Sequence, residues 1–347
     1  MARPPHLLAE GERMSETALV RVCVDAAGGD RAPSAVLEGV AAALDRDPSL
    51  AIVLVGPARD ILPFADAHAR VTAVETSEVI GMDDHPASAV RAKRDSSIVV
   101  GCGLVRDGVA DAFFSAGSTG ATMAAATLIM GRVPGLPRPA IAAVIPTVTT
   151  PTVLLDVGAN ADCKPEHLVT FAHMGRAYAR VVLGVEHPAT GLLNIGEEPT
   201  KGSALTVEAH SLLRDAIPGF VGNVEGRDVM TGAVDVIVTD GFTGNVALKL
   251  LEGTSRALLG QVKQALTSTF AARVAASVVA PPLRALKARL DPDTYGGAPL
   301  LGVKGVCIIG HGSSGCDAVA AGVKVAAQAV RGDLTGRIAA ALSHPSS

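Results

Sequence analysis

The segment with the clearest chemical potential is residues 240–249, which read D-G-F-T-G-N-V-A-L-K. A β-branched run at 234–238 precedes it and an apolar helical pattern follows, so the sequence predicts a buried strand joined to a helix by a tight turn. A helix N-terminus presents unpaired N–H groups and partial positive charge, which suit an anion. Because an acid, a threonine, an asparagine and a lysine crowd this turn, we expect a site that handles phosphate.

The same kind of turn recurs along the chain. A predicted strand is followed by a polar, glycine-containing turn after Asp25, Ser115, Asp156, Asn194, Asp240 and Gly310. In open α/β sheets such turns line the crevice outside the carboxyl ends of the strands, where ligands bind. We therefore expect the six turns to lie on one sheet edge and to form a wide polar cleft.

Strand and helix patterns alternate through the whole chain, which predicts a doubly wound, mostly parallel, Rossmann-like α/β sheet. The composition fits a sheet covered on both faces, because 48% of the residues are hydrophobic and only 3% are aromatic. Residues 19–335 are expected to form a single domain, residues 1–18 a disordered extension and residues 336–347 a flexible tail. The strands are predicted at 20–24, 51–56, 71–75, 110–114, 141–145, 152–155, 191–195, 234–238 and 306–309.

Composition and charge exclude several function classes. The net charge is −4, with two tyrosines and no tryptophan, so we expect no nucleic-acid partner. The five cysteines form no C-x-x-C pair, which favours reduced cytoplasmic thiols over disulfides or a structural zinc site. We expect neither a metal nor a cofactor.

Residues 254–294 break the pattern, because residues 254–290 carry basic side chains and no acid, with an apolar residue at every fourth position. They predict an inserted, basic, amphipathic helical hairpin. Such a surface can dock an acidic partner or an anionic membrane; the alternative is a core or dimer helix whose basic face is solvated. The docking candidates are Arg256, Lys263, Phe270, Arg273, Arg284 and Lys287.

The polar turns belong to longer motifs along the chain. They are V-D-A-A-G-G-D-R-A-P (24–33), S-A-G-S-T-G-A-T-M-A (115–124), L-L-D-V-G-A-N-A-D-C-K-P-E-H-L (154–168), L-L-N-I-G-E-E-P-T-K-G (192–202), the segment at 240–249, Y-G-G-A-P-L-L-G-V-K-G (295–305) and H-G-S-S (311–314). These motifs, spread over residues 20–330, resemble those of the bacterial phosphate acyltransferases. Two positions depart from the family pattern, with Ala27 where methionine is usual and Ser118 where asparagine is more frequent.

The resemblance implies an enzyme that moves a long-chain fatty acyl group from acyl carrier protein to inorganic phosphate, at the start of phospholipid synthesis. It implies a fold similar to phosphotransacetylases and isocitrate dehydrogenases, a homodimer, and peripheral association with the inner face of the cell membrane. A downstream acyl-phosphate:glycerol-3-phosphate acyltransferase is a further expected partner.

Within this reaction each candidate residue receives an expected role. Asn160 donates to the thioester carbonyl oxygen, His311 protonates the leaving sulfur, and Asp156 and Asp240 orient donors or a lysine. Lys249 or Lys201 counters the charge of the phosphate. The remaining candidates for phosphate or substrate binding are Gly117, Ser118, Thr119, Gly120, Asn194, Gly241, Thr243, Gly244 and Asn245.

Other readings of the same residues stay open. A decarboxylating dehydrogenase of the same fold would use NAD and a metal, although the first strand–helix unit lacks G-x-G-x-x-G. A non-catalytic, membrane-associated scaffold would not need six polar turns. Cys163 could act as a nucleophile beside His167, and Asp156, Asp162 and Asp240 could bind Mg²⁺.

Overall fold

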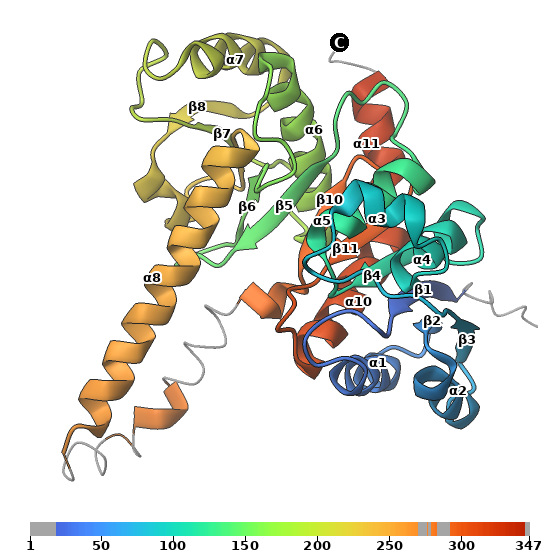
Figure 1. Cartoon of the computed structure of the whole chain (residues 1–347). Coiled ribbons are helices and arrows are strands. Elements are labelled where there is room, and N and C mark those ends of the chain that lie inside the picture. Colours follow the sequence, from blue (N-terminus) through green and yellow to red (C-terminus); the bar gives the residue numbers. More distant parts are fainter. Residues whose placement is uncertain (1–18, 270–275, 277–278, 283–291, 344–347) are drawn as a thin grey trace, which may run out of the picture.

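One sheet of eleven strands runs through the molecule, with the order β3-β2-β1-β4-β11-β10-β5-β6-β9-β7-β8 (Figure 1). The structure is a computed structural model and describes residues 19–269, 276, 279–282 and 292–343. The strands are β1 (Val20–Asp25), β2 (Leu50–Gly56), β3 (Val71–Glu75), β4 (Ala112–Ser115), β5 (Ala140–Ile145), β6 (Thr152–Leu155), β7 (Thr190–Leu193), β8 (Phe220–Val224), β9 (Val236–Val238), β10 (Ala298–Leu301) and β11 (Val306–Ile309).

The sheet consists of two parallel halves that run in opposite directions. Strands β3, β2, β1, β4 and β11 pair in parallel, as do β6, β9, β7 and β8, whereas β10 and β5 are joined to each other and to their outer neighbours by antiparallel pairing. The predicted mostly parallel α/β sheet is therefore confirmed. The prediction that all six turns lie on one edge is wrong, because β6, β9 and β7 end in the direction opposite to β1, β4 and β11.

The pairing register nevertheless brings the two sets of strand ends together. Ala298 at the start of β10 pairs with Ile309 at the end of β11, and Leu300 pairs with Ile141 near the start of β5. Ala142 in turn pairs with Leu155, the last residue of β6. The ends of β11 and β6 thus lie at nearly the same height, on either side of the two central strands β10 and β5.

Helices cover both faces of the sheet, as alternating side chains require. Phe113 and Phe114 of β4 belong to opposite cores, and each ring lies where a β-carbon on a covering helix would overlap it, at Gly101 and Gly322. The helices are α1 (Ser34–Arg46), α2 (Ala58–Ala67), α3 (Pro86–Ala92), α4 (Ser97–Arg106), α5 (Thr119–Ala125), α6 (Pro165–Val182), α7 (Ala204–Ala216), α8 (Gly241–Thr267), α10 (Cys316–Arg331) and α11 (Leu334–Ser343), with shorter turns η1 (Ala126–Met130), η2 (Gly226–Met230) and η3 (Pro292–Tyr295).

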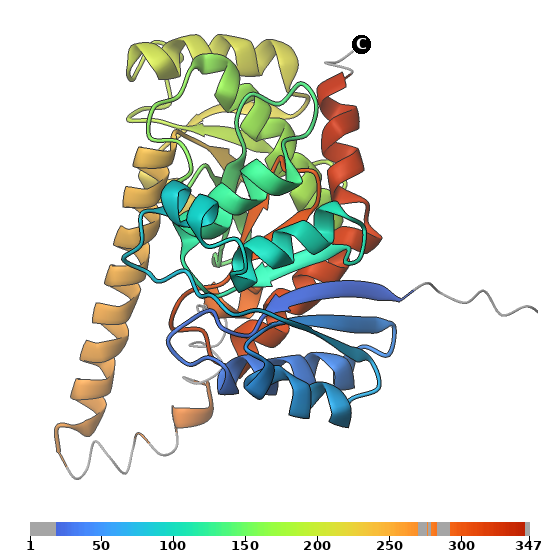
Figure 2. The same cartoon turned by 45° about the vertical axis from the view of Figure 1, so that its right-hand side comes forward.

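Helix α8 begins at the cleft and extends beyond the rest of the molecule (Figures 1 and 2). The first arm of the predicted hairpin is the continuation of this helix, while most of the second arm lies outside the described residues. Exposed apolar side chains recur along α8 at Phe242, Val246, Leu250, Leu258 and Val262. In the part of the chain that the structure describes, no helix has the length and apolar character needed to cross a bilayer.

The C-terminal boundary of the domain differs from the prediction. Residues 336–343, expected to belong to a flexible tail, form most of α11, which packs against α6. Leu334 and Ile338 are buried there. The sequence pattern was too short to separate a docked helix from a solvated one, and residues 1–18 and 344–347 lie outside the described part.

Substituting Ile338→Ala should lower the free energy of unfolding by about 2 to 5 kcal/mol, because it leaves a cavity under α11. Ile195→Ala is the matched control, since Ile195 is 81% exposed. Urea denaturation of the two variants measures the difference. Equal midpoints for both would contradict the docking of α11.

Candidate active site

A cleft of about 640 Å³ lies where the ends of the two half-sheets meet. Its walls come from the strand ends, the first turns of α5 and α8, and the loop after β11. Six of the residues proposed from the sequence line this cleft: Gly117, Thr119, Gly241, Asn245, Lys249 and His311. Turns from both halves therefore do contribute to one site, although they approach it from opposite directions.

Asp156 organises one wall of the cleft. It is fully buried at the end of β6, and its carboxylate accepts backbone hydrogen bonds from Ile141, Gly158, Ala159 and Asn160 at 2.7–3.2 Å. Burial raises the pKa of Asp156, and these hydrogen bonds oppose the rise. Its expected role in orienting other groups fits this geometry. With both oxygens engaged, Asp156 is not a free magnesium ligand.

The role expected for Asn160 is wrong in this geometry. Its side-chain nitrogen donates to the carbonyl oxygen of Pro139 and to Asp156, both at 2.8 Å. A side-chain amide has two hydrogens, so neither is left for a thioester carbonyl. Asn160 is also buried, and it holds the loop in place.

The first turn of α8 is packed onto this loop more tightly than its sequence indicates. A β-carbon at Gly241 would come within 2.6 Å of the Asn160 carbonyl oxygen, and one at Gly244 would overlap the Asp156 carbonyl oxygen. The Gly241 amide donates to that Asn160 oxygen at 2.8 Å. The two glycines are thus required for close packing.

Asp240 is the N-cap of α8. Its carboxylate accepts from the backbone and hydroxyl of Thr243 at 2.8 and 2.7 Å. Two of the first three amides of the helix, those of Gly241 and Thr243, already have partners inside the protein. The expectation of a helix terminus open to an anion is therefore corrected. The polar side chains of this helix that line the cleft are those of Asn245, Lys249 and Glu252.

Asp25 is the corresponding buried acid of the other half-sheet. The sequence analysis did not select it as a residue that supports the site. Asp25 at the end of β1 accepts from the Ser115 hydroxyl at 2.7 Å, and that hydroxyl accepts from the Gly117 amide at 3.0 Å. Burial raises the pKa of Asp25, and hydrogen bonds again oppose the rise. An acid that ends a buried strand, as at Asp156 and Asp240, was the signal available in the sequence.

The turn before α5 divides its predicted residues between lining and support. Gly117 and Thr119 line the cleft. Ser118 is buried and caps α5 by accepting from the Ala121 amide at 3.4 Å. A β-carbon at Gly120 would lie 2.7 Å from a side-chain carbon of Pro86. Ser118 and Gly120 therefore support the turn.

His311 and Lys249 both line the cleft and come from different halves of the sheet. The Nδ1 atom of His311 lies 2.8 Å from the Ser313 hydroxyl and 3.2 Å from the Ser313 amide nitrogen. The Nζ atom of Lys249 forms an ion pair with Glu252 at 2.9 Å. Glu252 also lines the cleft, so the lysine already has one carboxylate partner, and its ammonium group has further N–H donors for a bound anion.

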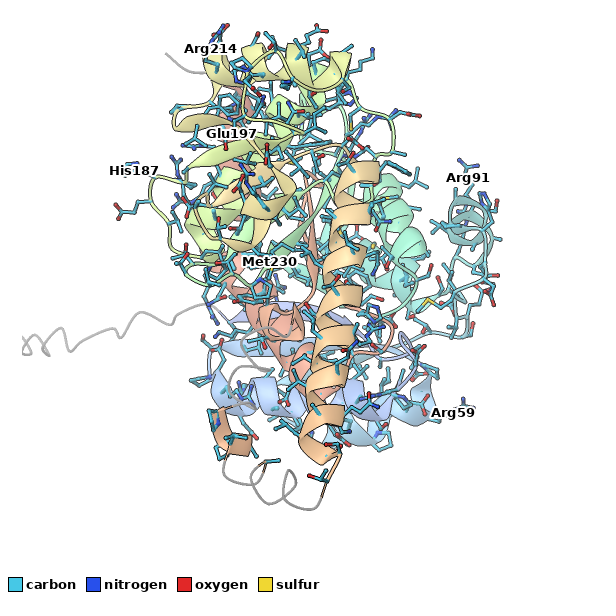
Figure 3. All side chains as sticks on the ribbon, turned by 90° about the vertical axis from the view of Figure 1, so that its left-hand side faces the viewer. Arg59, Arg91, His187, Glu197, Arg214 and Met230 are labelled. Carbon is cyan, nitrogen blue, oxygen red and sulfur yellow. The ribbon has the colours of Figure 1, made fainter. Side chains whose placement is uncertain are left out.

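Asn194 and Lys201 are not among the residues that line the cleft. They lie in the turn after β7, where the Asn194 amide donates to the Lys201 carbonyl oxygen at 2.9 Å and its oxygen accepts from Ile195. Figure 3 shows Glu197 of the same turn in the part of the molecule that also carries Arg214 of α7. A substrate-binding role for this turn is not supported by its position.

Most of the other lining residues are apolar and were not selected from the sequence, although Asp30, Tyr295 and Ser314 lie inside the motifs quoted above. They form largely apolar walls on the central strands and on α8, with a few polar groups from neighbouring loops. The additional lining residues include Asp30, Met82, Ile141, Ala143, Val144, Val157, Phe242, Leu248, Glu252, Tyr295, Ala298, Ile309 and Ser314.

Cys163 does not have the properties of a nucleophile. Burial raises the pKa of its thiol to about 11, and its Sγ atom donates to the Asn160 carbonyl oxygen at 3.6 Å. Nucleophilic cysteines need a lowered pKa. Among the described residues, no group of three or more His, Cys, Asp or Glu side chains is arranged to hold a metal ion.

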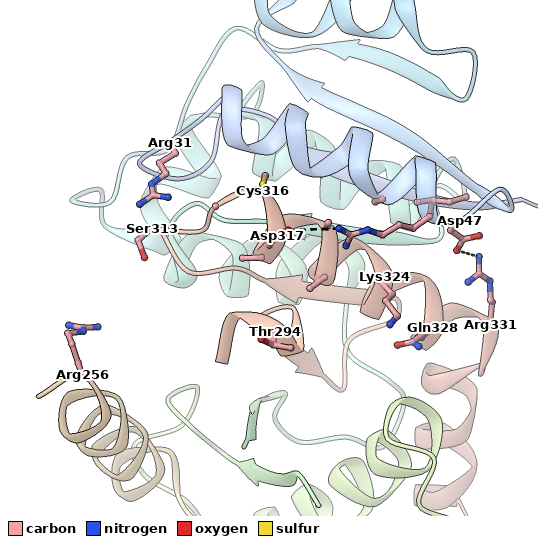
Figure 4. A pocket seen from close by; sticks show the side chains of 17 residues that line it. Arg31, Asp47, Arg256, Thr294, Ser313, Cys316, Asp317, Lys324, Gln328 and Arg331 are labelled. Carbon is pink, nitrogen blue, oxygen red and sulfur yellow. Dashed lines mark hydrogen bonds and ion pairs between the residues drawn. The ribbon is translucent and has the colours of Figure 1, made fainter. Parts of the chain in front are cut away.

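A second, larger cavity of about 1450 Å³ runs along α10 and α1 (Figure 4). We call it the basic groove, because its lining includes Arg31, Arg46, Arg256, Lys324 and Arg331 against only two acids, Asp47 and Asp317. Ser313 lines the groove at one end, while His311 in the same loop lines the cleft. The loop that carries His311 and Ser313 therefore lies between the cleft and the basic groove.

Gly244→Ala should lower the free energy of unfolding by about 3 kcal/mol or more, because the new methyl group meets the rigid backbone of Asp156. Gly253→Ala is the matched control on the same helix. A β-carbon there meets nothing within 4 Å, so alanine should stabilise the protein by about 0.5 to 1 kcal/mol. Thermal and urea unfolding compare the two. A tolerated Gly244→Ala would contradict the close packing of α8 on the loop.

Comparison with solved structures places the fold. The structure resembles a phosphotransacetylase from Streptococcus pyogenes with a TM-score of 0.57 at 16% identity, covering 90% of this chain and 94% of that one. It resembles a branched-chain phosphotransacylase from Enterococcus faecalis with a TM-score of 0.58 at 16% identity, covering 90% and 99%. The expected likeness to phosphotransacetylases is confirmed at the level of fold.

Sequence comparison is more specific. The family described as "Fatty acid synthesis protein" matches residues 20–337. The chain is 49% identical to the phosphate acyltransferase of Heliobacterium modesticaldum over 317 residues, covering 90% of this chain and 94% of that protein. It is 46% identical to the phosphate acyltransferase of Bacillus licheniformis over 312 residues, with the same coverage. These matches overturn the dehydrogenase and scaffold alternatives: the chain belongs to the phosphate acyltransferase family, acyltransferases of fatty acid and phospholipid synthesis.

Proposed function

We propose that the cleft transfers a long-chain fatty acyl group from acyl carrier protein to inorganic phosphate, giving acyl-phosphate and free carrier. The observation that carries the proposal is the meeting of two kinds of wall in one space. Thr119, Asn245, Lys249 and His311 supply polar groups, and the central strands and α8 supply apolar walls. This combination suits a small anion placed beside a thioester with an alkyl chain.

The reaction makes physical demands that these residues can meet. Phosphate must be held against the thioester carbonyl, and the charge that develops on the carbonyl oxygen must be stabilised. Thr119, Asn245 and Lys249 are placed to hold phosphate, with donors of Lys249 that Glu252 does not occupy. No covalent enzyme intermediate is required, in agreement with the protonated, partly buried Cys163.

Purified protein incubated with long-chain acyl carrier protein and phosphate tests the proposal directly. Acyl-phosphate and free carrier thiol should accumulate in equal amounts, and only when phosphate is present. Thiol release that does not depend on phosphate would show a thioesterase and would rule out the proposed transfer.

Lys249→Ala should raise the KM for phosphate by about 10- to 100-fold, because it removes a charged hydrogen-bond donor from the cleft. Lys201→Ala is the matched control, since Lys201 is an exposed lysine outside the cleft lining. Steady-state kinetics with phosphate as the varied substrate measure both variants. An unchanged KM in Lys249→Ala together with a raised KM in Lys201→Ala would reverse the assignment.

We propose that the acidic carrier protein docks along the basic groove and the adjoining first arm of the hairpin. Arg256 contributes to the groove and Lys263 is exposed further along α8. Phe270, Arg273, Arg284 and Lys287, also expected to dock, lie outside the described residues. The exposed apolar side chains of α8 support membrane association or a homodimer, as the resemblance implies, with the product passing to the downstream acyltransferase.

Charge reversal in the groove, Arg46→Glu combined with Lys324→Glu, should raise the KM for acyl carrier protein about tenfold and weaken its salt dependence. The KM for phosphate should not change. Arg214→Glu is the control, because Arg214 is exposed at the outer edge of the molecule (Figure 3). If only Lys263→Glu raises the KM for the carrier, docking is confined to the hairpin arm.

A further inference from the structure

Two groups of Ser313 hold the ring of His311 from one side. The Ser313 hydroxyl lies 2.8 Å from Nδ1 and the Ser313 amide nitrogen lies 3.2 Å from the same atom. His311 lines the cleft, whereas Ser313 lines the basic groove behind the loop. The Nδ1 edge of the ring is therefore turned toward its own loop, which leaves the Nε2 edge for the cleft.

This contact selects one tautomer of the imidazole. A backbone N–H can only donate, so Nδ1 must accept and cannot carry a proton in the neutral ring. The proton of neutral His311 is consequently on Nε2. No hydrogen bond joins Nε2 to another residue in the described ranges of the chain, so this N–H is available to a ligand in the cleft.

A neutral imidazole in this state is a hydrogen-bond donor and a poor proton donor, because losing the Nε2 proton would leave an imidazolate anion. The leaving thiolate has no need of that proton, since an alkyl thiol has a pKa of only about 8.5. A donor to the carbonyl oxygen, in contrast, is required. Asn160 is unable to supply it, because both of its amide hydrogens are bonded within the loop.

We propose that the Nε2–H of neutral His311 donates to the carbonyl oxygen of the thioester, and that Ser313 is the positioning residue that fixes this tautomer. The inference rests on the proposed acyl transfer to phosphate. It replaces the role of general acid expected for His311 from the sequence.

The step balances without any group of the enzyme giving up a proton. A phosphate oxygen forms a bond to the carbonyl carbon while the C=O π electrons move to the oxygen, whose charge the Nε2–H stabilises. The C=O bond then re-forms, and the C–S bond breaks with its electron pair on sulfur. The proton of hydrogenphosphate passes through solvent to the thiolate, and His311 begins and ends neutral.

Nitrogen-15 NMR of histidine-labelled protein tests the tautomer independently of activity. The chain has nine histidines, so the His311 signals are assigned by their loss in His311→Gln. Well above the pH at which the ring is protonated, the wild type should show the Nε2–H form. Ser313→Ala should keep this form, because it keeps the backbone N–H that selects the tautomer. An Nδ1–H form in the wild type would overturn the proposal.

Kinetics then separate a carbonyl donor from a general acid. His311→Ala should lower kcat about 10²- to 10³-fold, and His311→Gln should recover part of the loss because its amide nitrogen can reach the position of Nε2. The loss should be equal for acyl-pantetheine and for an acyl thioester of the more acidic thiophenol. A loss that shrinks with thiophenol would assign His311 to the sulfur and overturn the proposal.

Ser313→Ala should lower kcat about tenfold with the KM for phosphate unchanged, and Ser313→Thr should restore it. A Ser313→Ala variant with wild-type kcat would remove the Ser313 hydroxyl from its role in positioning the ring. Absence of phosphate-dependent turnover in the wild type would instead defeat the proposed function, while the NMR experiment would still report the tautomer.

Discussion

The buried carboxylate of Asp156 ties together the parts from which the cleft is built. It accepts amides from its own loop and from Ile141 at the start of β5, and so joins the end of β6 to a central strand. Because the loop is held in this shape, α8 can dock on it through Gly241 and Gly244. A buried carboxylate without these donors would be costly, so the loop, the strand and the helix depend on one another.

The second condition for the site is the antiparallel pair at the centre of the sheet. In a wholly parallel sheet, all carboxyl strand ends would share one edge, and ligands would bind in the crevice there. Here β10 and β5 pair antiparallel with each other and with their outer neighbours, and their register places the ends of β11 and β6 on either side of them. The catalytic candidates consequently come from both halves of the sheet, with His311 in the loop after β11 and Lys249 on α8, which follows β9.

The polar groups around the cleft form two sets, one that supports the loops and one that can bind a ligand. Asp25, Asp156 and Asn160 are buried and form hydrogen bonds within the protein. These bonds fix the loops. Thr119 and Asn245 are exposed to the cleft and keep donors for a ligand. Because the hydrogen bonds of the first set fix the loops, the donors of the second set are held in position before a ligand binds. Such fixed donors are the basis of electrostatic preorganisation.

The sequence by itself determined the strands that are β-branched and bounded by glycine, such as β11, and the identity of the turns that carry chemistry. It missed β10, because Pro299 in A-P-L-L is typical of a strand break, and it missed β8, whose F-V-G-N-V is half-exposed at the sheet edge. Only the tertiary structure decided the direction of each half-sheet, because strand direction depends on long-range pairing. The tertiary structure alone also decided which acceptors each side-chain donor binds. From the sequence, an asparagine in a polar turn is a possible donor to a ligand. In the fold, both amide hydrogens of Asn160 are bonded to Pro139 and Asp156.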